Sequence, residues 1–510
     1  MRTTKTTKLL ALTLSLLMLL TMIPLSVSAD ETTVTILDVA QNDGNGNYYL
    51  TGDVTVTATY VDEFTGTFDG NGYTVTTTVP LFNKVNGATI KNLTVTGTVT
   101  GYAAVASCVT SETLVSKFEN ITNKATVTNE TATITDGGFG VTSGVVSAGG
   151  IVCLVYNTKA EFIGCVNEGD ITANRLPAGI VSYVYTGEVS VSNCKNSGAI
   201  TSTGDNAAGI VACIYSGSTV EVSDSENSGA VCGNRYIGGI VGGLNTSTAD
   251  SNISVTKCSN SGSITATTTR AGGIVGYLKN KDAGYNISYC YNTASVTAEA
   301  GKQECGGIVG CLADTISKVA GCYNAGTVTG NQAAQIYWNT STDDRGLNYY
   351  LSDDSDSVLL PYYSSGSSYE GNSKSYAEGD LASGKLAYTM NTDIGQEIYF
   401  QNINTSDEIK DYYPVLDPTH EHVSNVNSGD SSNDEDDIPD DGKDDTQDTT
   451  SDTKDTTSDK KDTDTTKLED TTDEVVSGGC GSVVGGSALM IVGTVSLIGV
   501  VINKKRKENN

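Results

Sequence analysis

Short apolar runs recur along the middle of this 510-residue chain, separated by segments rich in Gly, Ser, Thr and Asn. The most regular run is a Gly-Ile-Val phrase that occurs six times. Its isoleucines are 29, 30, 30, 34 and 34 residues apart: Ile151, Ile180, Ile210, Ile240, Ile274 and Ile308. A second phrase, close to Cys-x-Asn-x-Gly-x-Ile/Val, follows each of them. Internal repetition with a period of about 20 to 50 residues predicts a solenoid.

Within each repeat the apolar positions alternate as they do in a strand. When the isoleucine is position zero, position two is always small and position four is always aliphatic, as in Cys153 and Val155. Side chains two residues apart share one face of a strand, so we expect these positions to point inward. Positions one, three and five, including the valine at position one, should then point outward. Stacked coils bury faces that one coil cannot, which predicts an all-β parallel β-helix with about 29–34 residues per coil.

The second phrase contributes two further columns. A buried asparagine amide must satisfy several hydrogen-bonding groups, and amides stacked about 4.8 Å apart can bond one another. We therefore predict a structural, non-catalytic ladder, with Asn123 as an earlier member, made of Asn167, Asn196, Asn227, Asn260, Asn292 and Asn324. The cysteines beside it are compatible with disulfides in an exported chain. Buried thiols are the favoured interpretation, because same-column partners do not readily meet disulfide geometry.

Two motifs carry a resemblance to a known group. The phrase "FDGNGYTV" from Phe68 pairs with "GATIKNLTVTG" from Gly87, and the repeats have the form "GGIVG" followed by "CYNAGTVTG". Over residues 64–331 the chain resembles the right-handed parallel β-helices with GLUG-type repeats found in adhesin-like surface proteins of Gram-positive bacteria. The later "YYPVLDP" resembles the closing segment of such proteins, which implies a cap on the last coil. An amphipathic helix is expected over residues 377–391.

The two ends of the chain predict export and anchoring. A basic start, an apolar run and Val27-Ser28-Ala29 form a signal peptide. The apolar run 483–502, followed by four basic residues, is long enough to cross a membrane and leaves the tail cytoplasmic. Before it lies an acidic stretch rich in Asp, Thr and Ser that cannot bury a core and is expected to be disordered. The predicted organisation is 1–29 signal peptide, 30–63 N-terminal β segment, 64–350 β-helix, 351–421 cap, 422–479 stalk, 480–503 transmembrane anchor and 504–510 basic tail.

Charge and residue chemistry exclude several functions. A net charge of −30 argues against nucleic-acid binding, which needs a basic face. The two histidines, His420 and His422, lie at the predicted stalk junction and lack the spacing of a zinc helix. A charge stripe of mixed sign most simply forms surface ion pairs: Arg175, Asp205, Arg235, Arg270 and Glu304. We therefore expect no catalytic residues, no metal and no cofactor.

The outward positions give one candidate binding site. Position five is Tyr156, Tyr185 and Tyr215 in three successive coils, and position three adds Tyr183. Tyrosine offers a flat apolar face and a hydroxyl, which suits glycans or cell-surface proteins as partners. The sequence thus predicts a membrane-anchored, surface-displayed adhesin-like or ligand-binding protein without catalysis. Two alternatives stay open: a polysaccharide lyase or glycoside hydrolase on the β-helix face, and a structural spacer of the cell envelope.

Overall fold

The computed structural model describes residues 34–57, 60–134, 145–215, 217–245, 251–278, 285–299, 304–313, 318–339, 346–352, 373–403 and 410–424. The predicted signal peptide, most of the acidic stalk, the transmembrane anchor and the basic tail lie outside the described residues. Within the described ranges, no helix is long and apolar enough to cross a membrane.

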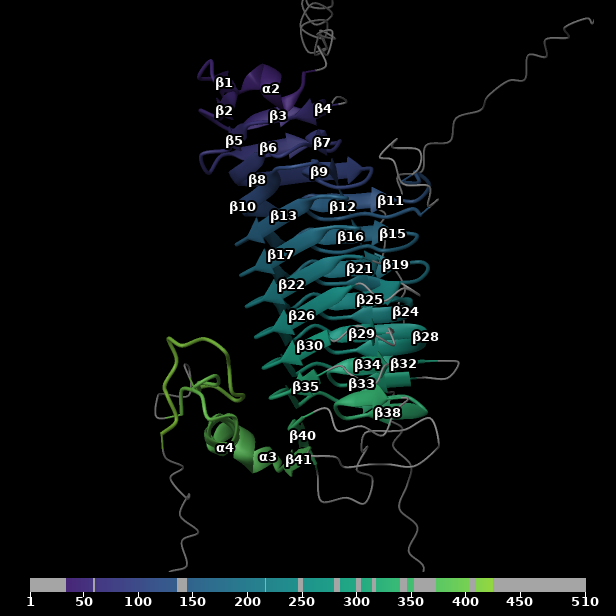
Figure 1. Cartoon of the computed structure of the whole chain (residues 1–510), viewed down its shortest axis with the longest axis vertical. Helices are drawn as coiled ribbons and strands as arrows, with labels where there is room; N and C mark the ends of the chain where they lie inside the picture. Colours follow the sequence, from purple (N-terminus) through teal and green to yellow (C-terminus); the bar gives the residue numbers. More distant parts are fainter. Residues whose placement is uncertain are drawn as a thin grey trace, which may run out of the picture. The chain divides into compact units, whose positions relative to one another are not determined.

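The described residues form a parallel β-solenoid, as the repeats predict (Figure 1). One side is a ten-stranded sheet, one strand per coil. In stacking order its strands are β4 (Val61–Phe64), β7 (Phe82–Val85), β9 (Ala106–Val109), β12 (Val152–Tyr156), β16 (Val181–Tyr185), β21 (Val211–Tyr215), β25 (Val241–Asn245), β29 (Val275–Leu278), β34 (Val309–Leu312) and β39 (Tyr337–Asn339).

The remaining described strands form a second sheet of 31 strands that makes up the other sides of the coils. Its first part comprises β1 (Gln41–Asn42), β2 (Asn47–Tyr49), β3 (Val54–Val56), β5 (Thr67–Asp69), β6 (Thr74–Thr77), β8 (Thr89–Thr100), β10 (Val115–Asn123), β11 (Thr126–Asn129), β13 (Lys159–Ile163), β14 (Val166–Asn167), β15 (Ile171–Ala173), β17 (Glu188–Ser192), β18 (Lys195–Asn196), β19 (Ile200–Ser202) and β20 (Ala207–Ala208). The later coils contribute β22 (Thr219–Ser223), β23 (Glu226–Asn227), β24 (Val231–Gly238), β26 (Asn252–Thr256), β27 (Ser259–Asn260), β28 (Ile264–Gly272), β30 (Tyr285–Ser288), β31 (Tyr291–Asn292), β32 (Val296–Ala298), β33 (Glu304–Gly306), β35 (Lys318–Ala320), β36 (Tyr323–Asn324), β37 (Val328–Thr329), β38 (Gln332–Ala334), β40 (Tyr349–Leu351) and β41 (Lys374–Tyr376).

Like residues stack on like from coil to coil. Val152 pairs with Val181, and Ile171 pairs with Ile200, in parallel register. The interior is one continuous apolar core that contains the repeated isoleucines at 0% exposure. The valines at position one are also fully buried in it, so the prediction that they form an exposed column is wrong. The chain bends at Gly150 and Ile151, which interrupts strict alternation and lets consecutive Ile and Val side chains both enter the core.

The asparagines form a hydrogen-bonded ladder in the interior. Each Nδ2 donates to the side-chain Oδ1 one coil further on, for example from Asn167 to Asn196 and from Asn196 to Asn227, both at 2.7 Å. Each also donates within its own turn, as Asn227 does to the carbonyl of Gly229 at 2.8 Å. Asn123 starts the ladder, and Asn324 ends it by donating to Oε1 of Gln335 at 2.8 Å. Every amide in the series therefore has partners although it is out of reach of water.

The cysteine column beside the ladder consists of free thiols. Cys165, Cys194, Cys258, Cys290 and Cys322 are all buried and unbridged, in agreement with the favoured interpretation. The thiol of Cys165 donates to the carbonyl of Phe118 in the preceding coil at 3.4 Å, and the other members repeat this geometry. These cysteines act as small buried side chains that fit the corner of each coil.

The first coil begins earlier than the motif at Phe64 predicts. β2, β3 and β4 already pair in parallel with β5, β6 and β7 of the next coil. Ahead of them, β1 pairs antiparallel with β2, and the short helix α2 (Ile36–Val39) contributes the buried Ile36 to the end of the core. The N-terminal segment thus closes the core from residue 36 onward, and the repeating architecture starts at residue 47.

The C-terminal cap contains two helices where one was expected. α3 (Glu378–Ala382) and α4 (Lys385–Ile394) are separated at Ser383 and Gly384, and Gly384 has a φ of 79° that ends the helical path. The cap packs against the last coils through tyrosines. The hydroxyl of Tyr399 donates to the carbonyl of Gly321 at 2.6 Å, and that of Tyr376 to the carbonyl of Asn324 at 2.8 Å. Val423 is 3% exposed, so the folded cap extends past residue 421.

Candidate functional site

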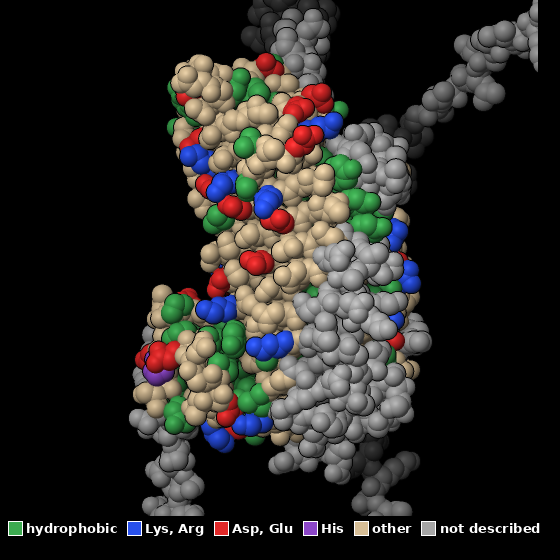
Figure 2. Space-filling model, in the orientation of Figure 1, with side chains coloured by type: hydrophobic (Ala, Val, Ile, Leu, Met, Phe, Trp, Pro, Cys, Tyr) green, Lys and Arg blue, Asp and Glu red, His purple; other side chains and the backbone are tan. Residues whose placement is uncertain are grey.

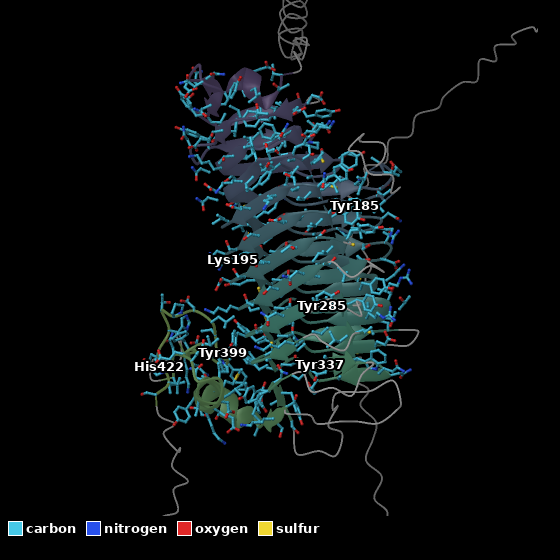
Figure 3. The ribbon with its side chains drawn as sticks, in the orientation of Figure 1. Tyr185, Lys195, Tyr285, Tyr337, Tyr399 and His422 are labelled. Atoms are coloured by element: carbon cyan, nitrogen blue, oxygen red, sulfur yellow. The ribbon has the colours of Figure 1, made fainter. Side chains whose placement is uncertain are left out.

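Three of the four predicted tyrosines lie together on the outer side of the ten-stranded sheet. Tyr156, Tyr185 and Tyr215 end strands β12, β16 and β21, and each is partly buried. The rings of Tyr185 and Tyr215 are stacked, with centroids 4.6 Å apart and planes 8° apart. Tyr156 lies 5.7 Å from Tyr185 at a tilt of 36°. We call these residues, with Tyr183, the tyrosine patch; Figure 3 labels Tyr185 within it.

Tyr183 points outward from its strand as predicted, but it is buried and not exposed at the surface, which corrects the prediction of an exposed strip. Its side chain is 3% exposed, and its ring meets Tyr185 and Tyr215 edge-on at 5.8 and 6.2 Å. Burial raises the pKa of its hydroxyl far above the usual value of 10. It belongs to a second, smaller apolar cluster that includes Leu154 and Cys213.

A neighbouring segment accounts for this burial. Ile134 and Val145 belong to the same small cluster as Tyr183, and Thr133 pairs antiparallel with Val146. The hydroxyl of Tyr102 donates to the carbonyl of Thr133 at 2.8 Å, which ties this segment to the solenoid. Tyr183 is therefore the buried member of the tyrosine patch and supports the others. The rings of Tyr156, Tyr185 and Tyr215 form its accessible part.

A second aromatic cluster, which the repeat pattern did not predict, joins Tyr277 of the ten-stranded sheet to Tyr236 of β24 in the other sheet. The rings of Tyr236 and Tyr277 stack with centroids 4.7 Å apart. The guanidinium of Arg270 lies 5.3 Å from the first ring centroid and 4.4 Å from the second, and it donates to the hydroxyl of Tyr236 at 3.1 Å. One feature of the sequence could have indicated this cluster: Tyr277 stands at position three of its repeat, the position that Tyr183 occupies in an earlier repeat. Cys213 and Gly243 occupy that position in the two coils between Tyr183 and Tyr277.

The predicted charge stripe forms ion pairs, but not all of them lie at the surface. Asp205 accepts from Arg235 at 2.7 Å and lies 3.8 Å from Arg175. Arg270 pairs with Glu304, whose side chain is only 2% exposed. The prediction of surface ion pairs is therefore wrong for this last pair, because the aromatic cluster covers it. Arg175, Asp205 and Arg235 thus link three successive coils, and Arg270 and Glu304 link two later coils.

The catalytic and metal chemistry of the described residues is sparse. Among them, no group of three or more His, Cys, Asp or Glu side chains is placed to hold a metal ion. His420 lies within the folded cap, because residues 410–424 pack onto the helices and the last coils. Figure 2 shows one face of the molecule, on which Lys, Arg, Asp and Glu side chains are interspersed and no large surface of one charge appears.

Comparisons with known proteins add little to this description. No family model matches the chain, and no curated protein matches it. Among solved structures, a protein described as "a putative immunoglobulin A1 protease" from Bacteroides ovatus is similar to it at 11% identity and a TM-score of 0.26. That match covers 68% of this chain and 85% of the other.

Proposed function

We propose that this chain is an adhesin-like protein of the cell surface that binds a protein on a neighbouring or host cell through the tyrosine patch. The observation that carries the proposal is the stacked pair Tyr185 and Tyr215, held rigid by the buried ring of Tyr183. Rigid, partly exposed tyrosines lose little conformational entropy on binding and are enriched in the centres of protein interfaces.

The surroundings of the tyrosine patch support a protein partner. Arg175, Asp205 and Arg235 form a row of ion pairs that runs from the coil of Tyr185 through that of Tyr215 to the next coil. A central aromatic cluster with polar residues at its border is the usual anatomy of a protein interface. The patch lies on the face of a sheet and not in one of the pockets found among the described residues. A flat site of this kind suits the broad surface of a protein partner better than a small molecule. Glycan binding at the same rings is the alternative outcome of the test.

The rest of the proposal concerns the setting of the solenoid. We infer a right-handed coil with GLUG-type repeats, export by residues 1–29 and retention by a transmembrane helix at 480–503, with the acidic segment 422–479 as a stalk. This arrangement, typical of the Gram-positive surface proteins that the motifs resemble, would display the patch away from the membrane. The proposal includes no catalytic residue, metal or cofactor.

The test is binding of the full-length protein to arrays of extracellular-matrix and cell-surface proteins, with glycans as a second panel. We expect the double variant Tyr185→Ala, Tyr215→Ala to lose at least tenfold in affinity for the protein ligand. Tyr60→Ala, which removes a tyrosine that is 45% exposed elsewhere on the surface, is the matched control. Unchanged binding by the double variant would remove the patch from the proposal. Absence of any ligand would favour the spacer, and release of sugar fragments would favour the lyase or hydrolase.

A further inference from the structure

A cleft of about 520 Å³ lies between the C-terminal cap and the 31-stranded sheet of the solenoid, whereas the tyrosine patch lies on the ten-stranded sheet. Its solenoid wall includes Glu226, Ser259 and Tyr291, and its cap wall includes Tyr413 and residues 415–418 together with His420. In Figure 2 the cap projects from the side of the solenoid.

The cleft follows from one outward-facing column of the repeat. The residue between Cys and Asn in the second phrase is Lys195, Glu226, Ser259, Tyr291 and Tyr323 in successive coils. The cap docks on the later tyrosines, and the hydroxyl of Tyr323 donates to the carbonyl of Pro414. The column changes from the small side chain of Ser259 to the large ring of Tyr291 in the next coil. This step in side-chain size forms the inner end of the cleft.

Tyr291 has one ring face covered and the other turned toward this step. It stacks on Tyr323 with centroids 5.0 Å apart and planes 4° apart. At the equivalent place in the coil on its other side stands Ser259, whose side chain is too small to cover an aromatic ring. Burial raises the pKa of the Tyr291 hydroxyl, which keeps it a neutral hydrogen-bond donor. The ring is thus a fixed platform beside hydroxyl groups.

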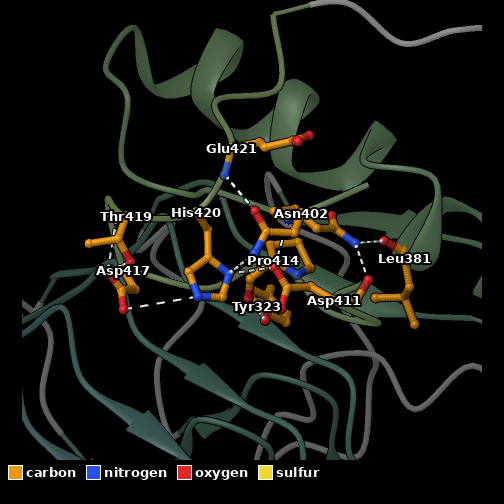
Figure 4. A network of polar contacts seen from close by, with 10 residues as sticks. Tyr323, Leu381, Asn402, Asp411, Pro414, Asp417, Thr419, His420 and Glu421 are labelled. Atoms are coloured by element: carbon orange, nitrogen blue, oxygen red, sulfur yellow. Dashed lines mark hydrogen bonds and ion pairs between the residues drawn. The ribbon is translucent and has the colours of Figure 1, made fainter. Parts of the chain in front are cut away.

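The opposite wall is held by a polar network around His420 (Figure 4). Nδ1 of His420 lies 2.5 Å from Oδ2 of Asp411 and 3.0 Å from Nδ2 of Asn402. Nε2 lies 4.0 Å from Oδ2 of Asp417, which also lines the cleft. The backbone is pinned as well, because the N–H of Glu421 donates to Oδ1 of Asn402 at 3.0 Å. The imidazole is therefore oriented by Asp411, and its Nε2 edge is the one directed toward Asp417.

We propose that this cleft binds a neutral oligosaccharide, with one sugar ring on Tyr291 and its hydroxyls bonded to the carboxylate of Asp417 and Nε2 of His420. A sugar ring has an apolar C–H face and an edge of hydroxyls, which matches an aromatic platform bordered by polar groups. Asp224, Glu226 and Asp417 outnumber Lys257 among the other charged residues of the lining, which disfavours a polyanionic chain. This site is independent of the tyrosine patch and of the proposed protein partner.

The experiment is titration of the full-length protein with cellotriose, maltotriose, mannotriose and chitotriose, followed by calorimetry and saturation-transfer NMR. We expect one of these probes to bind and Tyr291→Ala to weaken it about tenfold, since the platform is lost. His420→Gln should weaken the same probe severalfold through the lost hydrogen bond. Tyr73→Ala, which alters a tyrosine that is 36% exposed near the N-terminus, should bind normally.

A second variant separates binding from folding. Ser259→Trp leaves every cap contact of Tyr323 in place but covers the free face of the Tyr291 ring, so binding should be lost while the melting temperature is kept. The proposal is overturned if none of the four probes binds, or if binding survives both Tyr291→Ala and Ser259→Trp. Loss of binding to protein ligands in the double tyrosine variant does not bear on this result, because the two sites share no residue.

Discussion

Gly239 lies directly against the side chain of Asn260 in the same coil, so that a Cβ built on this glycine would come within 2.6 Å of Oδ1 of the asparagine. The same relationship holds in each of the six repeats, between the glycine before Ile-Val and the asparagine of the second phrase. The two phrases recur together because they meet across the narrow interior of each coil. The glycine is required by space, not by backbone conformation.

Gly239→Ala is therefore expected to destabilise the solenoid strongly. The added methyl group would collide with the backbone carbonyl of Gly273 and with the amide of Asn260, which cannot move without breaking the ladder. Overpacking of this kind costs about 1–3 kcal/mol, and disruption of the ladder adds to it. Thermal unfolding of the full chain measures the effect. Gly52→Ala is the control, because a Cβ at Gly52 meets no atom within 4 Å, and it should leave the melting temperature unchanged.

Asn227→Ala should be similarly costly because the change lies in the middle of the ladder. Asn227 accepts from Asn196 at 2.7 Å and donates to Asn260 at 2.7 Å, so its removal takes one hydrogen bond from each of these two buried amides. Each such loss costs about 1–3 kcal/mol. The exposed Asn174, whose amide bonds only Thr203 within the described residues, offers the control Asn174→Ala with an effect near zero. Equal unfolding curves for the two variants would contradict a stabilising ladder.

The repeat predicts the fold because its fixed residues are those that stacking requires. Ile151, Asn167 and Cys165 recur at equivalent places, and parallel register follows once like stacks on like. The spacing also predicts that Tyr156, Tyr185 and Tyr215 are neighbours, since residues at one position of successive coils are adjacent. Local pattern and global architecture agree here, as expected where each coil repeats the same contacts.

Features that depend on contacts between unrelated segments could not be predicted. Tyr183 alternates outward as expected, yet Ile134 and Val145 belong to the cluster that buries it, and nothing in the repeat indicates that this segment folds back. The cleft beside Tyr291 likewise exists because residues 410–420 return to the solenoid about 120 residues later in the chain. Such placements are set by tertiary packing, which overrides local periodicity.

The buried cysteines should be unreactive in the folded protein. Burial raises the pKa of Cys153 to about 12 and that of Cys305 to about 12, and it raises the pKa of Cys165 and Cys290 well above 9. Because the thiolate is the nucleophile, thiol reagents at pH 8 should not label these four residues in the native state. Mass spectrometry after iodoacetamide treatment tests this, with labelling in guanidinium as the positive control. Native-state labelling of Cys165 would show that the corner of the coil opens readily.

The docking of the cap should weaken in acid through Asp393. Burial alone would raise the pKa of this carboxyl, but hydrogen bonds from Lys374 at 2.6 Å and from the hydroxyl of Tyr349 at 2.5 Å hold the pKa below 3.8. A carboxyl whose pKa is lower in the folded state stabilises it above the unfolded value, and this stabilisation is lost as the pH falls through the folded pKa. The near-ultraviolet circular dichroism of the tyrosines packed in the cap should therefore change below about pH 4.

Asp393→Asn separates this pair from other acid-sensitive groups. The variant should have a less stable cap at pH 7 and should lose the part of the acid transition that comes from Asp393, because an amide does not titrate. Asp38→Asn is the matched control, since hydrogen bonds from Thr35 lower the pKa of that carboxyl too, but it lies at the N-terminal end of the solenoid. If the tyrosine signal of Asp393→Asn titrated as that of the unmodified chain does, the contact between α4 and the last coils would not depend on this carboxylate, and the other tyrosine hydroxyls would have to hold the cap in acid.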